Sequence, residues 1–157
     1  MNLKRYGALV VVLALTAASC GSDSDSDGAG SENATADPVH DLTAGAIASA
    51  NSDLGDIIVD DAGNTLYLFV PDAQGDSTCY DDCEAAWPVL GEATGVGDGL
   101  DASLLGTTER TNGDIQATYN GWPLYYFAKD VAVGDTNGQG VGDVWYVLDA
   151  AGSAIGN

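Results

Sequence analysis

Positively charged side chains are almost absent from this sequence of 157 residues, which has four Lys and Arg against 24 Asp and Glu. Nucleic-acid binding draws its affinity from neutralising phosphates with Lys and Arg, so this charge balance excludes it. The same deficit opposes adsorption to anionic lipid headgroups. The remaining partners are an unidentified protein, a cation or a neutral ligand of the cell envelope.

Histidine and methionine are also scarce, with one residue of each. The histidine, His40, follows a polar stretch and is expected at the surface. The sequence contains no nucleophile elbow, phosphate-binding loop or zinc motif, and no histidine base in its β-rich part. These absences disfavour an enzyme, and we expect no bound cofactor.

No apolar run reaches the length of about 20 residues that spans a bilayer. The longest run, residues 8–15, follows two cations and precedes Ala17-Ala18-Ser19 and Cys20. This order is typical of a secretory signal peptide. The small residues before Cys20 resemble a lipobox, although Ala17 stands where Leu is usual. We therefore expect cleavage after residues 1–19, a diacylglycerol on Cys20 and a membrane-anchored protein outside the cytoplasm; the alternative is ordinary cleavage with a free thiol.

Residues 20–41 lack aromatic side chains and are rich in Ser, Asp and Gly. Such a segment cannot bury enough apolar surface to offset the entropy of ordering it, so we predict a disordered acidic tether. Residues 42–157 have the length of a single domain. Removing the signal leaves two cations, Arg110 and Lys129, against all 24 acids, a formal charge of −22.

The predicted domain is mainly β, because short β-branched and aromatic runs alternate with glycine-containing turns. It also matches itself at an offset of 58 residues, with Leu66-Tyr67 on Leu124-Tyr125 and Trp87 on Trp145. Matches at one fixed offset indicate two copies of a supersecondary unit. We place them at about residues 54–90 and 112–148.

Each copy is predicted to contain an antiparallel hairpin and a closing strand. In the first copy residues 57–59 pair with 66–70, and in the second 115–119 pair with 124–127. The closing strands are residues 87–90 and 144–148. Since an isolated hairpin is only marginally stable, we expect the copies to pack about a pseudo-twofold axis, with Trp87 and Trp145 as core anchors.

One motif occurs in both copies, a Tyr, an aromatic residue two positions later and an Asp three positions after that. Its members are Tyr67, Phe69 and Asp72, and then Tyr125, Phe127 and Asp130. Tyr and Phe share one strand face because side chains alternate. Each Asp follows the strand, where a carboxylate can accept backbone N–H groups of the next loop. The alternative is a carboxylate pair lining a site on the pseudo-twofold axis.

The motif resembles the Tyr-x-(Phe/Trp/Tyr)-x-x-Asp signature of a bacterial family of predicted lipoproteins, also described as a secreted repeat of unknown function. The segments Cys79-x-x-x-Cys83-x-x-x-Trp87-Pro88, residues 119–125 and residues 134–140 are similar to further hallmarks of that family. The resemblance covers about residues 54–150. It implies export, lipidation and a tandem repeat, but no particular activity.

Cys79 and Cys83 occur only in the first copy. In a helical turn they would lie about 6 Å apart at Cα, within the disulfide range, and an extracytoplasmic compartment favours oxidation. A structural disulfide is our leading prediction. The alternative is redox chemistry or Cu(I) binding by two thiolates, although the acidic neighbours oppose thiolate formation.

Asp135 and Asn137 lie in a glycine-rich loop that resembles a calcium-binding loop but has Tyr146 where an EF-hand requires Glu. We expect a tight turn there, with calcium as the alternative. Trp122, Tyr125 and Tyr126 are candidate surface contacts, or else core residues. The leading hypothesis is a non-catalytic binding or interaction module, and the competing one is a redox or copper-handling protein centred on the cysteine pair.

Overall fold

The structure is a computed structural model that describes residues 45–156, and every structural statement below concerns that part of the chain. The signal peptide, the tether, Cys20 and His40 lie outside the described residues. Among the described residues no helix is long and apolar enough to cross a membrane.

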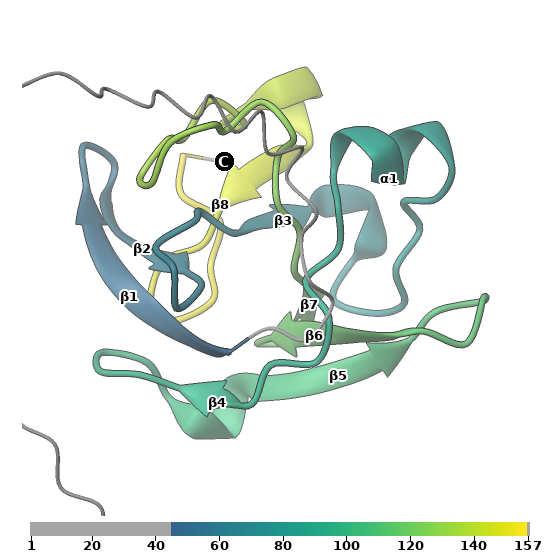
Figure 1. Ribbon diagram of the computed structural model, residues 1–157, viewed down its shortest axis with the longest axis horizontal. Helices are drawn as coiled ribbons and strands as arrows, with labels where there is room; N and C mark the ends of the chain where they lie inside the picture. Colours follow the sequence, from purple (N-terminus) through teal and green to yellow (C-terminus); the bar gives the residue numbers. More distant parts are fainter. Residues whose placement is uncertain (1–44, 157) are drawn as a thin grey trace, which may run out of the picture. The chain divides into compact units, whose positions relative to one another are not determined.

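Eight short strands and four short helical segments make up the described domain (Figure 1). The strands are β1 Ala46–Ser52, β2 Gly55–Val59, β3 Tyr67–Phe69, β4 Gly95–Val96, β5 Leu105–Glu109, β6 Ile115–Tyr119, β7 Trp122–Pro123 and β8 Trp145–Val147. The helical segments are η1 Val70–Asp72, α1 Asp82–Ala86, η2 Ala102–Leu104 and η3 Val141–Asp143. The mainly β fold and the helical turn between the cysteines agree with the sequence prediction.

Each copy begins with a strand that the sequence did not reveal. In the first copy β1 pairs with β2 in antiparallel register, and in the second β5 pairs with β6 in the same way. The sequence of β1, Ala-Ile-Ala-Ser-Ala-Asn-Ser, has one large apolar side chain and no strong strand pattern. The repeat is therefore one strand longer at its N-terminal end than residues 54–90 and 112–148.

The two copies exchange their closing strands. The strand β3 of the first copy pairs with β8 of the second, with Tyr67 opposite Val147 and Phe69 opposite Trp145. The second copy mirrors this arrangement, because Tyr125 forms a β-bridge with Val89 of the first copy. The Tyr-containing segment of each copy thus pairs with the closing segment of the other.

The pseudo-twofold axis passes between Tyr67 and Tyr125. These two residues form an antiparallel bridge in which each backbone N–H donates to the other carbonyl, at 2.8 Å and 3.0 Å. Reciprocal bonds between equivalent residues are expected where a twofold axis crosses an antiparallel pair. The predicted packing of two copies about such an axis is observed.

Four aromatic rings stack on the same axis. Trp87 and Trp145 lie parallel with ring centroids 3.8 Å apart, and the stack is extended by Phe127 on Trp87 and by Phe69 on Trp145, each at 4.2 Å. Both tryptophans are buried. Aromatic pairs contribute about 0.5–1.5 kcal/mol each beyond the burial of their surface. Every contact in this stack joins the first copy to the second.

The uniform offset of 58 residues is wrong in two places. Backbone bonds of Ile58 to Leu148 and Leu66 are matched by those of Ala117 to Leu90 and Leu124, so Ile58 corresponds to Ala117. The hairpin between β5 and β6 is one residue longer than the hairpin between β1 and β2. The turn after β6 is one residue shorter than the turn after β2. Ile57 and Ile115 are consequently not equivalent: Ile57 is buried, whereas Ile115 is 42% exposed.

The exchanged strands predict that neither copy folds alone. Separate fragments of residues 20–100 and 101–157 should each be unfolded monomers, because each lacks the partner strand for its Tyr-containing strand. Mixing them should restore the near-ultraviolet circular dichroism of the stacked tryptophans, with the intact chain as reference. A single fragment that unfolds cooperatively as a monomer would contradict the arrangement.

Candidate functional site

The two motif tyrosines donate hydrogen bonds to the aspartates of the opposite copies. Tyr67 Oη donates to Asp130 Oδ2 at 2.6 Å, and Tyr125 Oη donates to Asp72 Oδ2 at 2.7 Å. Both tyrosine side chains are fully buried. Charge-assisted bonds of this kind are about twice as strong as neutral ones. The motif therefore connects the two copies through side chains as well as through strands.

The second oxygen of each motif aspartate holds the loop that follows its strand. Asp72 Oδ1 accepts the backbone N–H of Thr78 at 2.8 Å and its hydroxyl at 2.7 Å. Asp130 Oδ1 accepts the backbone N–H of Asn137 at 2.9 Å. Thr78 thus corresponds to Asn137 rather than to Thr136, which the constant offset had paired with it. Each carboxylate thus accepts a tyrosine hydroxyl on one oxygen and a loop N–H on the other.

Burial sets the protonation of this motif. It raises the pKa of Tyr67, Tyr125 and Tyr126 far above the ordinary value, and carboxylate acceptors raise these pKa values further. The carboxylate beside Tyr126 is Asp60, which accepts its hydroxyl at 3.0 Å. Burial also raises the pKa of Asp130, and this effect outweighs the hydrogen bonds from Tyr67 and Asn137 that lower it.

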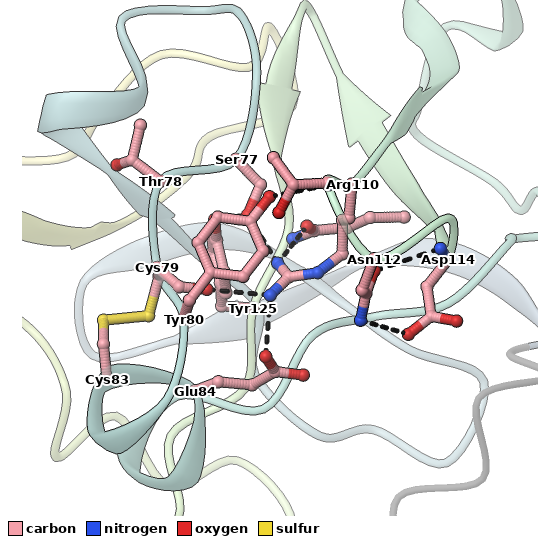
Figure 2. A network of polar contacts seen from close by, with 12 residues as sticks. Ser77, Thr78, Cys79, Tyr80, Cys83, Glu84, Arg110, Asn112, Asp114 and Tyr125 are labelled. Atoms are coloured by element: carbon pink, nitrogen blue, oxygen red, sulfur yellow. Dashed lines mark hydrogen bonds and ion pairs between the residues drawn. A yellow bond between two sulfur atoms is a disulfide. The ribbon is translucent and has the colours of Figure 1, made fainter.

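Arg110, from the hairpin between β5 and β6, lies at the centre of a polar cluster that includes the first-copy loop (Figure 2). Its side chain is fully buried, and its Nη2 donates to Glu84 Oε2 at 2.7 Å and to the Cys79 carbonyl at 2.8 Å. Its Nη1 donates to Ser77 Oγ and to Gln116 Oε1. A buried charge is costly unless it is paired and hydrogen-bonded, and this guanidinium has both kinds of partner.

The Arg110 cluster joins the motif through one hydroxyl. Ser77 Oγ lies 2.8 Å from Tyr125 Oη. Because Tyr125 gives its only hydroxyl proton to Asp72, Ser77 is the donor to Tyr125. The bonds therefore run in one direction, from Arg110 through Ser77 and Tyr125 to Asp72.

The sequence shows Arg110 only as a charge and does not reveal this role. The ring of Tyr80 covers the guanidinium, with Cζ 4.3 Å from the ring centroid. The available signal was that Arg110 is one of two cations retained in an otherwise acidic chain. Its partners in the first-copy loop, however, lie 26 to 33 residues away in sequence.

The cysteine pair is a disulfide, as predicted. Cys79 and Cys83 are joined with a Cα–Cα distance of 5.3 Å. Cys79 is fully buried against the aromatic core, and α1 begins between the two cysteines. The disulfide therefore holds the segment whose carbonyl and Glu84 side chain bind Arg110.

Two of the three candidate surface contacts belong to the core. Tyr125 and Tyr126 are buried and hydrogen-bonded inside, so they are core residues and not surface contacts. Trp122 in β7 is half-buried and packs on the edge of the apolar core.

The calcium-like loop uses its polar groups internally. Asp135 Oδ2 accepts the backbone N–H groups of Val131 and Ala132 at 3.0 Å and 2.9 Å. Asn137 donates its backbone N–H to Asp130. Within residues 45–156, no group of three or more His, Cys, Asp or Glu side chains is placed to hold a metal ion.

The reciprocal tyrosine bonds predict a graded loss of stability. Tyr125→Phe should lower the free energy of unfolding by about 1.5–3 kcal/mol, because it removes a bond to a buried carboxylate. Tyr67→Phe should cost less, since Asp130 is half-buried and can gain water. Tyr146→Phe is the control, a buried tyrosine from β8 outside the motif. Denaturant unfolding measures all three, and equal midpoints would refute the role of the motif.

The raised pKa values of Tyr67, Tyr125 and Tyr126 predict alkaline unfolding. Unfolded tyrosines ionise near pH 10, about their ordinary value, whereas these three remain protonated in the fold. The stabilisation linked to these three tyrosines is therefore fully present below about pH 10. It is lost as the pH rises towards their pKa values in the folded protein. Phenolate absorbance should rise together with loss of tryptophan circular dichroism. Ionisation of all tyrosines near pH 10 in a folded protein would contradict this.

Comparison with known proteins gives one family. The model of a family described as a secreted repeat of unknown function matches twice, at residues 48–91 and 106–149. These two matches begin inside β1 and β5, the strands that begin the copies in the structure. No curated protein and no solved structure matches the chain. The matches cover more than half of the sequence, and the chain belongs to this family of secreted repeats.

Proposed function

We propose that this protein is a non-catalytic binding or interaction module, anchored by a lipid on Cys20 outside the cytoplasmic membrane. Membership of a secreted family supports the extracytoplasmic location. The N-terminal pattern of cations, a short apolar run and small residues before Cys20 supports the lipid anchor. The disulfide is in keeping with an oxidising compartment.

The observation that carries the non-catalytic part is the internal use of the motif. Catalytic acids, bases and nucleophiles must reach a substrate within hydrogen-bond distance. Here Tyr67, Tyr125, Asp72 and Asp130 bind one another and the loops that follow their strands. The internal bonds of the repeated motif therefore support a role in holding the two copies together.

The competing redox or copper function receives less support. A copper site would need two free thiolates, whereas Cys79 and Cys83 are bonded to each other. Cys79 is fully buried, and an attacking thiol must reach a disulfide sulfur to exchange with it. The pair also occurs in one copy only. These observations favour a disulfide that supports the Arg110 cluster.

The lipid anchor predicts the behaviour of a single substitution. Cys20→Ser should move the protein from the membrane fraction to the soluble secreted fraction, because it removes the thiol that would carry the diacylglycerol. Ser19→Ala is the matched control and should leave the protein in the membrane fraction, since it keeps a small residue before the cysteine. Membrane retention of Cys20→Ser, or a mass without lipid in the unsubstituted protein, would refute the anchor.

A further inference from the structure

The symmetry between the two copies is broken at one sheet edge. In the first copy β4 lies parallel to β1 and covers the edge opposite to β2. Gly97 N–H donates to the Ile47 carbonyl at 2.6 Å, and Ser49 N–H donates to the Asp98 carbonyl at 3.5 Å. This edge therefore both accepts and donates hydrogen bonds to an extended segment.

The equivalent edge of the second copy is that of β5. Ala117, which lies opposite Thr107, directs its N–H to Leu90 and Gly91 and accepts from Leu124, all on the side away from β5. Thr107 and Ala117 therefore form a non-hydrogen-bonded pair, and the N–H and C=O of Thr107 point to the outer side. Thr107 occupies the position that Ser49 has in the first copy.

No strand covers this outer side within residues 45–156. The described sheet ends at β5, in the order β5-β6-β7, and Figure 1 shows β5 as its outermost ribbon. The segment that would match β4 at the repeat offset, residues 153–154, turns back on its own copy instead. Ile155 N–H donates to the Val147 carbonyl, and Asp149 N–H donates to the Ser153 carbonyl. The position that β4 fills in the first copy is open in the second.

The acidic residues around the open edge determine the charge of the segment that would bind there. Asp101 precedes η2, Glu109 ends β5 and Asp114 precedes β6 in the same hairpin, and all three are exposed. The buried Arg110 is already paired with Glu84. Acidic residues on an edge strand oppose pairing with a second copy of the same acidic chain. A positively charged extended segment would meet attraction at both ends of β5.

We propose that the outer edge of β5 binds an extended, positively charged segment of a partner protein by strand addition, parallel to β5 as β4 is to β1. Backbone bonds to the Leu105 carbonyl and to the Thr107 N–H supply binding, and the acidic residues supply selectivity. This proposal rests on the proposed role as an interaction module and specifies where and what it binds.

The test uses the secreted Cys20→Ser chain and a synthetic peptide with the sequence of residues 94–97 flanked by lysines. The peptide should slow hydrogen exchange at the Thr107 amide. A glutamate-flanked twin should bind about tenfold more weakly, and added salt should reduce the difference. Thr107→Pro removes the outward N–H at an edge position that tolerates proline and should abolish binding, whereas Thr107→Val should retain it.

Each other outcome overturns the proposal. Equal binding of the two peptides would exclude selection by charge, and binding that Thr107→Pro leaves unchanged would exclude the edge. Perturbation of Ser49 in place of Thr107 would mean that the peptide displaces β4. Protection of Thr107 that rises with protein concentration without peptide would assign the edge to a second copy. Because Cys20→Ser tests the anchor separately, a failed peptide experiment leaves the result on membrane attachment intact.

Discussion

The fold depends on exchange between its two copies at a single pair of residues. Tyr67 and Tyr125 bond to each other through their backbones, and each hydroxyl reaches the motif aspartate of the other copy. Each tyrosine lies edge-on against the tryptophan of its own copy, at 5.4 Å for Trp87 and 5.1 Å for Trp145, and the two tryptophans stack on each other across the copies. Removing one copy would remove the strand partner, the hydroxyl acceptor and the ring partner of the other at once.

This constraint explains which features the sequence could predict. Repeated aromatic residues and glycines are visible at a fixed offset, so the duplication and the pseudo-twofold axis follow from the sequence. The predicted hairpins are present only in part, because β2 and β6 pair mainly with β1 and β5, and β3 pairs with β8. Local spacing also suffices for the Cys79–Cys83 disulfide. The exchange of tyrosine hydroxyls does not follow, because an aspartate of the same copy and one of the other copy are indistinguishable in a repeated motif. The strand β1 could not be predicted, because its hydrogen bonds to β2 define it more than an alternation of apolar side chains does.

Symmetry is kept at the axis and lost in the loops. Around Tyr125 the first-copy loop adds Ser77 and a disulfide, and the hairpin between β5 and β6 adds the buried Arg110. Around Tyr67 the second-copy loop supplies only the backbone N–H of Gly138, at 3.3 Å. An added Cβ on Gly138 would lie 2.8 Å from the Tyr67 ring, so the backbone itself fills the space here. The copies share the constraint that couples them and differ where that constraint no longer acts.

The acidic surface and the unpaired edge are physically related. An exposed strand edge normally invites pairing with another molecule, and proteins prevent this with charge or with a covering segment. The first copy uses β4 as a cover, whereas the second has Glu109 and neighbouring acids at the open edge. A covering segment excludes every partner, but charge excludes only partners of like sign, and its range falls to about 8 Å in physiological salt. The edge that β4 covers in the first copy is thus left to charge in the second, while the bonds at the pseudo-twofold axis are the same in both copies.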